Sequence, residues 1–250
     1  MKRPVKIGLI VGGAVLLLVA TIVANIVRLN SCVHDVVVKV KLDRTPQLVS
    51  QQTVKDSVFA ALPHLSSTRV SDVDCDRVVE AAMRVPFVES ATASVSVSGK
   101  VVVKAVQRRP VARLFYGNRE CYFDNTGTIF PVSELADCNV IVAGGNFREP
   151  LRRDSLNSQM QDLVAVALFL DRNSNYRMLV DQIFVEADGD LYVVPKMGDM
   201  VVELGDAQNL EGKFANMLAF YRNGMPRVGW NTYSGISLKY DGQVVCTKRK

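Results

Sequence analysis

Histidine, tryptophan and the motifs of common catalytic sites are scarce or absent in this chain. The 250 residues include two histidines and one tryptophan. His34 and His64 have no neighbouring catalytic partner in the sequence, so we expect both to be solvated surface residues. The patterns G-x-S-x-G, H-E-x-x-H and the Walker loop are absent. Gly144-Gly145-Asn146 lacks the lysine and hydroxyl of a phosphate loop and predicts a turn. We therefore expect no enzyme, no cofactor, no metal site and no small-molecule substrate.

Closely spaced cysteine pairs are also absent. The five cysteines, at positions 32, 75, 121, 138 and 246, form no C-x-x-C pair, which excludes the usual zinc-ligand spacing. Cys121 and Cys138 flank a predicted hairpin, so a disulfide between them is possible in an oxidising compartment. The alternative is that they are buried free thiols that behave as small apolar residues.

Charged residues are missing from the segment that runs from Ile7 through Leu17 to Val27. As a helix, these 21 residues cover about 30 Å, the thickness of the hydrocarbon core of a bilayer. The cations that precede the segment are Lys2, Arg3 and Lys6. They predict a single-pass transmembrane anchor over 7–27, with residues 1–6 in the cytoplasm and the rest exported.

Two cleavage readings compete with the uncleaved anchor. A signal peptide has a shorter apolar core and a small-x-small exit, whereas the candidate exits here carry bulky residues. Leu29-Asn30-Ser31-Cys32 is similar to a lipobox, although Arg28 interrupts the apolar run before it. We expect the anchor, and leave a protein cleaved near Cys32, either secreted or lipidated, as the alternative.

Most of the excess basic charge of the chain lies beside the apolar segment, where it indicates the orientation of that segment in a membrane. The formal net charge is +5, but removing Lys2, Arg3, Lys6 and Arg28 leaves 26 basic and 25 acidic residues in 29–250. The exported part is nearly neutral and has no basic stripe for phosphates. We therefore expect no nucleic-acid binding.

The first exported segment predicts a compact unit of about 70 residues with the order strand, helix, helix, strand, strand. Ser50 and Asp74 (or Asp72) are expected to cap the two helices, and Pro63 and Pro86 to limit them. Val54, Val58, Val78 and Met83 are among the residues expected to face inward. The strands are expected at 36–42, 91–98 and 100–106.

The chain after Pro110 is rich in short predicted strands. These lie at 111–115, 120–124, 128–132, 140–143, 183–187, 191–194, 200–204, 235–240 and 243–247. One helix is expected to open at Asp154, with Leu156 as its first core residue, and another to be capped by Asp206 and closed by Asn223-Gly224. The fold class is therefore α+β, with a second domain built on an extended antiparallel sheet and two helices.

The terminal strand is the candidate binding surface, because the last strand of a chain often lies at a sheet edge and accepts a partner strand. Alternation along Ile236–Tyr240 places Ile236, Leu238 and Tyr240 on one face, expected to be the core. Ser237 and Lys239 are then expected to face outward beside the open ladder. The alternative is an ordinary edge strand that lysine protects from pairing.

Four local motifs, in this order behind the apolar segment, resemble the FtsQ/DivIB family of bacterial cell-division proteins. They are Val85–Ala91 (V-P-F-V-E-S-A), Gln107–Ala112 (Q-R-R-P-V-A), Tyr122–Phe130 (Y-F-D-N-T-G-T-I-F) and Tyr233–Tyr240 (Y-S-G-I-S-L-K-Y). The chain departs from the family pattern at Gln107 and Ser237, where an acid is usual, and at Lys239, where arginine is usual.

The resemblance implies a POTRA-like β-α-α-β-β domain over 33–106 and an FtsQ-type β domain over 107–250. It implies a non-enzymatic scaffold of the divisome at the division septum. The anchor would lie in the inner (cytoplasmic) membrane, with both domains in the periplasm. FtsB/FtsL-type partners would add a strand at the C-terminal edge, and other divisome members would bind elsewhere.

Carried over to this sequence, Lys239 would meet a partner carboxylate and Tyr240 would pack on the partner's apolar side chains. The residues implied to bind the partner are Ser237, Leu238, Lys239, Tyr240, Gln243 and Val244. The competing function class is a POTRA-containing export or assembly factor, which would share only the small domain.

Overall fold

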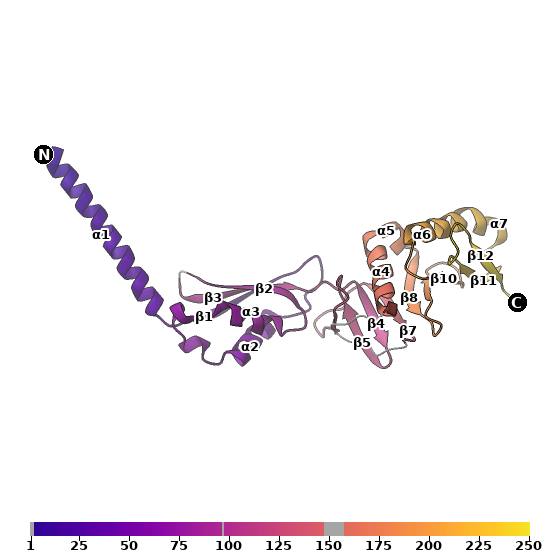
Figure 1. Cartoon of the computed structure of the whole chain (residues 1–250), viewed down its shortest axis with the longest axis horizontal. Helices are drawn as coiled ribbons and strands as arrows, with labels where there is room; N and C mark the ends of the chain where they lie inside the picture. Colours follow the sequence, from indigo (N-terminus) through magenta and orange to yellow (C-terminus); the bar gives the residue numbers. More distant parts are fainter. Residues whose placement is uncertain (1–2, 97, 148–157) are drawn as a thin grey trace. The chain divides into compact units, whose positions relative to one another are not determined.

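The computed structural model describes residues 3–96, 98–147 and 158–250, and for 3–11 and 28–29 it describes the backbone. The chain divides into two compact units, Met1–Arg108 and Arg109–Lys250, each with its own buried cluster (Figure 1). The domain boundary expected after Val106 lies two residues before this division.

The N-terminal helix α1 extends from Arg3 to Asn30 and includes the whole apolar segment, with Ile7 in its first third. Leu17 and Val27 are 68% and 65% exposed. Within the part of the chain that the structure describes, no helix has both the length and the apolar character that a membrane crossing requires.

The first unit has the element order expected from the sequence. After α1 it contains β1 (Asp35–Lys41), α2 (Gln51–Ala61), the 3-10 turns η1 (Leu65–Ser67) and η2 (Val70–Asp72), α3 (Cys75–Met83), β2 (Val88–Val95) and β3 (Lys100–Gln107). Both expected caps are confirmed, because Ser50 accepts a hydrogen bond from the Thr53 N–H and Asp74 accepts from those of Asp76 and Arg77.

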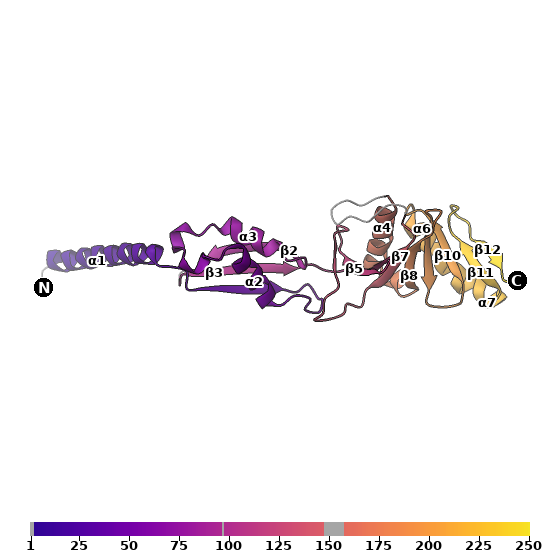
Figure 2. The ribbon, with the colours of Figure 1, turned by 90° about the horizontal axis from the view of Figure 1, so that it is seen from below.

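The three strands of this unit form one sheet in the order β1-β3-β2, with β1 parallel and β2 antiparallel to β3. Figures 1 and 2 show α2 and α3 against one face, where Val36, Val101 and Val103 pack in the same cluster as helix residues Val54 and Val78. Met83, expected to face inward, is exposed instead, because α3 buries Val78, Ala81 and Ala82 and turns its last residue to solvent.

The second unit is a nine-stranded sheet with helices on one face (Figure 2). Its elements are β4 (Ala112–Tyr116), β5 (Arg119–Phe123), β6 (Ile129–Pro131), β7 (Ile141–Gly145), α4 (Ser158–Arg172), α5 (Ser174–Arg177), β8 (Val180–Val185), β9 (Leu191–Pro195), β10 (Val201–Gly205), α6 (Leu210–Ala219), the π-helix η3 (Phe220–Gly224), α7 (Met225–Val228), β11 (Tyr233–Ser237) and β12 (Val245–Lys248).

The large sheet is mixed, so the expectation of an antiparallel sheet was wrong. The spatial order is β12-β11-β10-β9-β8-β7-β4-β5-β6, and the pairs β4–β7, β7–β8 and β10–β11 are parallel. Each of the last two pairs is joined through helices, α4–α5 in one case and α6–η3–α7 in the other. A helical crossover returns the chain to the starting end of the sheet, which makes the next strand parallel.

Three local predictions in this unit are corrected or fall outside the structure. Asn209, not Asp206, caps α6, and its side chain accepts from the Gly212 N–H. Gly144 and Gly145 end strand β7 and do not form a turn. Asp154 and Leu156, the expected start of the first helix, lie outside the described residues. Four later members of that stripe, Met160, Leu163, Ala167 and Leu170, are buried as expected.

Candidate functional site

The C-terminal end of the large sheet is an open edge formed by β12. This strand pairs antiparallel with β11 on one side, and no described strand pairs with its other side. The expected edge at Ile236–Tyr240 is therefore corrected: β11 holds residues 233–237 and lies between β10 and β12. The Asp241-Gly242 turn brings the chain back as one further strand, and the unpaired N–H and C=O groups belong to that strand.

Side chains around the end of β11 follow the expected alternation up to residue 239. Ile236 and Leu238 are buried, whereas Ser237 is half-buried and Lys239 is exposed. Tyr240 departs from the prediction, since its side chain is 58% exposed and not in the core. The reason is that β11 ends at Ser237, so the strand alternation no longer applies three residues later. An exposed tyrosine therefore lies in the turn that leads into the edge strand β12.

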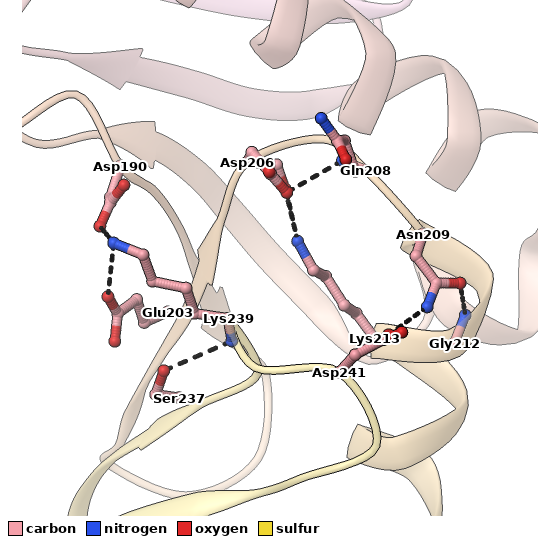
Figure 3. A network of polar contacts seen from close by, with 10 residues as sticks. All are labelled: Asp190, Glu203, Asp206, Gln208, Asn209, Gly212, Lys213, Ser237, Lys239 and Asp241. Atoms are coloured by element: carbon pink, nitrogen blue, oxygen red, sulfur yellow. Dashed lines mark hydrogen bonds and ion pairs between the residues drawn. The ribbon is translucent and has the colours of Figure 1, made fainter.

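Lys239 is the charged centre of this region (Figure 3). Its ammonium group pairs with the Asp190 carboxylate, from the turn before β9, and lies 4.0 Å from Glu203 Oε1 on β10. The hydrogen bond to Asp190 raises the pKa of Lys239. The Lys239 N–H is 3.4 Å from Ser237 Oγ, its acceptor. One cation thus faces two carboxylates, which lie on the inner side of β11, on β10 and before β9, and not on the edge strand itself.

Gly205 explains how the lysine reaches these acids. At Gly205, where φ is +75°, an added Cβ would lie 2.8 Å from Lys239 Cγ. The aliphatic stem of Lys239 therefore packs directly over the end of β10 at a position that has no side chain. Any larger residue there would displace the lysine from Asp190 and Glu203.

The turn between β11 and β12 is tied to the start of α6. Asn209 Nδ2 donates to Asp241 Oδ1 at 2.6 Å (Figure 3). Within the turn, the Gln243 N–H donates to the Tyr240 carbonyl at 3.2 Å. Gln243 is exposed, whereas Val244 is half-buried and packs against the core of the unit. The expected binding residues 237–240, 243 and 244 are thus brought together around one turn.

Next to this turn, a buried lysine fixes the first turn of α6. The Lys213 ammonium donates to the Asp206 carbonyl at 2.9 Å and to Asp206 Oδ1 at 2.6 Å. Lys213 is buried, and its hydrogen bond lowers the pKa of Asp206. Because Asn209 belongs to the same turn, this pair supports the contact between Asn209 and Asp241.

Sequence reasoning missed Val245, which is 45% exposed on the edge strand itself. Val244 and Cys246 are half-buried and pack against the core, while Val245 and Thr247 are exposed, as strand alternation requires. This alternation over 244–247 was visible in the sequence. It was overlooked because the adjacent motif drew the prediction to Ile236–Tyr240.

The remaining candidate groups belong to other elements of the two units. His34 and His64 are exposed, as expected. Cys121 and Cys138 are free thiols in the structure, half-buried and buried, and burial raises the pKa of Cys121 to about 11. Such a thiol is a poor nucleophile. Among the described residues, no group of three His, Cys, Asp or Glu side chains is placed to hold a metal ion.

The second unit resembles a known protein family. A family model described as "FtsQ/DivIB, C-terminal related" matches residues 109–247, more than half of the chain and almost all of the second unit. No curated protein matches the chain. The matched range contains β4 to β11 and most of β12, and thus the whole turn around Lys239.

Proposed function

The chain belongs to the FtsQ/DivIB family of cell-division proteins, and from that membership we propose that it is a non-enzymatic, membrane-anchored divisome scaffold. In this proposal its C-terminal edge recruits FtsB/FtsL-type partners by strand addition and so supports septal wall synthesis. The first unit acts as the POTRA-like domain and engages other divisome members.

The observation that carries the proposal is the open edge of β12, which follows the turn that holds Lys239 and Tyr240. Exposed sheet edges are sites where an extended peptide adds a strand: main-chain hydrogen bonds supply affinity and alternate side chains supply specificity. A strand added to β12 would lie next to Val245 and Thr247. The residues of the partner that flank this added strand would reach Tyr240. A tyrosine of this exposure offers a large apolar surface at a low entropy cost.

Lys239 would select the partner by charge. A partner carboxylate that reached the end of β11 would compete with Asp190 and Glu203 for its ammonium group. Exposed ion pairs contribute about 0–1 kcal/mol each, so this exchange affects specificity and register more than affinity. The apolar contacts of Tyr240 and Val245 would provide most of the binding energy.

The anchor is the second part of the proposal. Helix α1 carries a run of exposed aliphatic side chains, among them Val15, Leu16, Leu18, Ile22 and Val23. Exposed surface of this kind is unfavourable in water and favourable in lipid. We therefore propose that residues 7–27 lie in the cytoplasmic membrane, with both units on the periplasmic side. Mass spectrometry of the mature N-terminus tests this, because cleavage or acylation at Cys32 would contradict it.

The partner proposal is tested by measuring the affinity of the chain for the FtsB/FtsL-type ectodomains. Tyr240→Ala and Val245→Glu are each expected to weaken binding by about tenfold or more, and Lys239→Glu by less. Matched controls are Phe115→Ala, an exposed aromatic on β4, and Lys196→Glu, an exposed lysine after β9. If none of the three edge variants changes the affinity while the folded state is retained, the edge is not the binding site.

Depletion in cells separates the function classes. A division scaffold predicts filamentous cells and midcell localisation of a fluorescent fusion. An export or assembly factor predicts accumulated precursors with normal septa, and that result would overturn the proposal.

A further inference from the structure

The sheet of the first unit has one face that no described helix covers. On it, Lys39 of β1 lies opposite Lys104 of β3, which in turn lies opposite Thr92 of β2. All three side chains are exposed. One register row therefore presents two ammonium groups and a hydroxyl, at the strand spacing of about 4.8 Å.

The neighbouring rows extend this surface. Two residues further along β1, the row consists of Lys41, Val106 and Ser90. Two residues back, it consists of Val37, Val102 and Ser94. We name Lys39, Lys41 and Lys104 the lysine face. It is bordered by half-buried valines on β1 and β3 and by exposed serines on β2.

The lysine face is not neutralised by ion pairs in the part of the chain that the structure describes. Within the described ranges, none of its three lysines forms an ion pair. Asp35, the first residue of β1, is paired with Lys55 at 3.0 Å and also lies near Lys100. Like charges directly opposite on adjacent strands repel, so an anionic surface that covers this row would relieve the repulsion.

We propose that the lysine face lies on the anionic headgroups of the membrane in which α1 is anchored. This inference rests on the anchor of the proposed function. Only residues 31–34 separate α1 from β1, and four extended residues span at most about 14 Å. The start of β1 is thus held close to the headgroup layer, and Lys39 and Lys41 lie four and six residues along this strand, where clustered lysines are attracted to anionic lipid. The exposed threonine and serines beside it provide hydrogen-bond donors for phosphate oxygens.

The experiment uses the full chain reconstituted in vesicles of phosphatidylcholine alone or of phosphatidylcholine mixed with phosphatidylglycerol. Acetylation rates of individual lysines are read by mass spectrometry. In the anionic vesicles Lys39, Lys41 and Lys104 are expected to react about fivefold more slowly, and added salt is expected to abolish the difference. Lys55, paired on α2, and Lys196, in the second unit, are the internal references and should not change.

A pair of charge-matched variants tests the face itself, with Lys41 as the reporter. The double variant Lys39→Glu with Lys104→Glu is expected to remove the protection of Lys41. Arg77→Glu with Arg84→Glu changes the net charge equally on the helical side of the unit and should leave that protection intact.

The outcomes separate this inference from the anchor. A chain that fails to float with either vesicle contradicts the anchor. A chain that floats but shows equal lysine reactivity in both vesicles overturns the docking of the lysine face. Protection that requires an added acidic protein, and is absent with anionic lipid alone, also overturns it.

Discussion

The side-chain amide of Gln107, the last residue of β3, binds the loop that follows β1. It is fully buried, and its Oε1 accepts from the N–H groups of Leu48, at 2.7 Å, and Val49, at 3.3 Å. Its Nε2 donates to Thr45 Oγ1 at 3.0 Å and to the Pro46 carbonyl at 2.8 Å. An ionised carboxylate in this place would direct an oxygen at a carbonyl oxygen. The family's usual acid therefore does not fit this pocket in its charged form.

We expect Gln107→Glu to lower the free energy of unfolding by about 2 kcal/mol at neutral pH. The deficit should shrink as the pH falls, because a protonated carboxyl can donate to the Pro46 carbonyl. Urea denaturation at several pH values measures this, with Gln182→Glu, an exposed position on β8, as the matched control. Equal stability of the two variants at neutral pH would contradict the pocket described above.

The ionisation of Asp206 makes the free energy of unfolding depend on pH, and the sign of this dependence follows from its lowered pKa. The hydrogen bond from Lys213 lowers the folded-state pKa of this carboxyl, so its stabilisation is present above the unfolded-state pKa and is lost as the pH falls through the folded-state value. Because half of the carboxylate side chain is exposed, we expect Asp206→Asn to cost only about 1 kcal/mol at neutral pH.

The difference between Asp206→Asn and the parent should shrink as the pH falls through the lowered folded-state pKa of Asp206, which urea midpoints at a series of pH values would show. Asp181→Asn, at an exposed position on β8, is the control and should change little at any pH. A difference that grows on acidification would have the wrong sign.

At the scale of elements, the close pairing of β7 and β8 depends on Gly145. Its φ is +140°, and an added Cβ would lie 2.2 Å from the Val185 carbonyl oxygen, within the backbone of the neighbouring strand. The paired glycines noticed in the sequence therefore serve strand packing at the parallel junction.

We expect Gly145→Ala to destabilise the second unit by about 3 kcal/mol or more, since neither backbone can give way. Gly117→Ala is the control: φ there is also positive, at +57°, but nothing lies within 4 Å of the added Cβ, so only about 1 kcal/mol is expected. Thermal denaturation of both variants isolates the contact, and similar losses would contradict this explanation.

Helix α6 shows where element prediction failed. Asp206, Gln208 and Asn209 are all polar residues ahead of an apolar stripe, and local preference does not discriminate strongly between Asp and Asn as caps. Asp206 is engaged instead by Lys213, seven residues later, which leaves Asn209 to cap the helix. The choice is made by a contact between Asp206 and a buried lysine of the same helix, which the capping preferences do not include.

At the scale of the whole molecule, the two units have separate cores. The cluster that contains Val36 and Val103 shares no residue with the one that contains Ile183 and Phe214. We expect the fragment 109–250 to fold alone and to bind the partner ectodomain with the affinity of the full chain. Urea denaturation should show one cooperative transition, at the midpoint of the corresponding transition in the full chain. A non-cooperative fragment would show that the second unit needs the first.

The sequence by itself determined the features that depend on local chemistry. Apolar alternation located most strands, Ser50 and Asp74 predicted two helix starts, and motifs such as Tyr233–Tyr240 indicated the family that the comparison shows. These signals are local, because capping and strand alternation act over a few residues.

Tertiary structure alone decided which strands are neighbours. It made the large sheet mixed, placed β12 outside β11, exposed Tyr240 and paired Lys239 with Asp190, which is 49 residues away in the sequence. Pairing between distant strands depends on the return path of the chain and on packing against helices, neither of which a local pattern encodes. The position of the open edge, and with it the candidate binding site, was therefore fixed only by the assembled sheet.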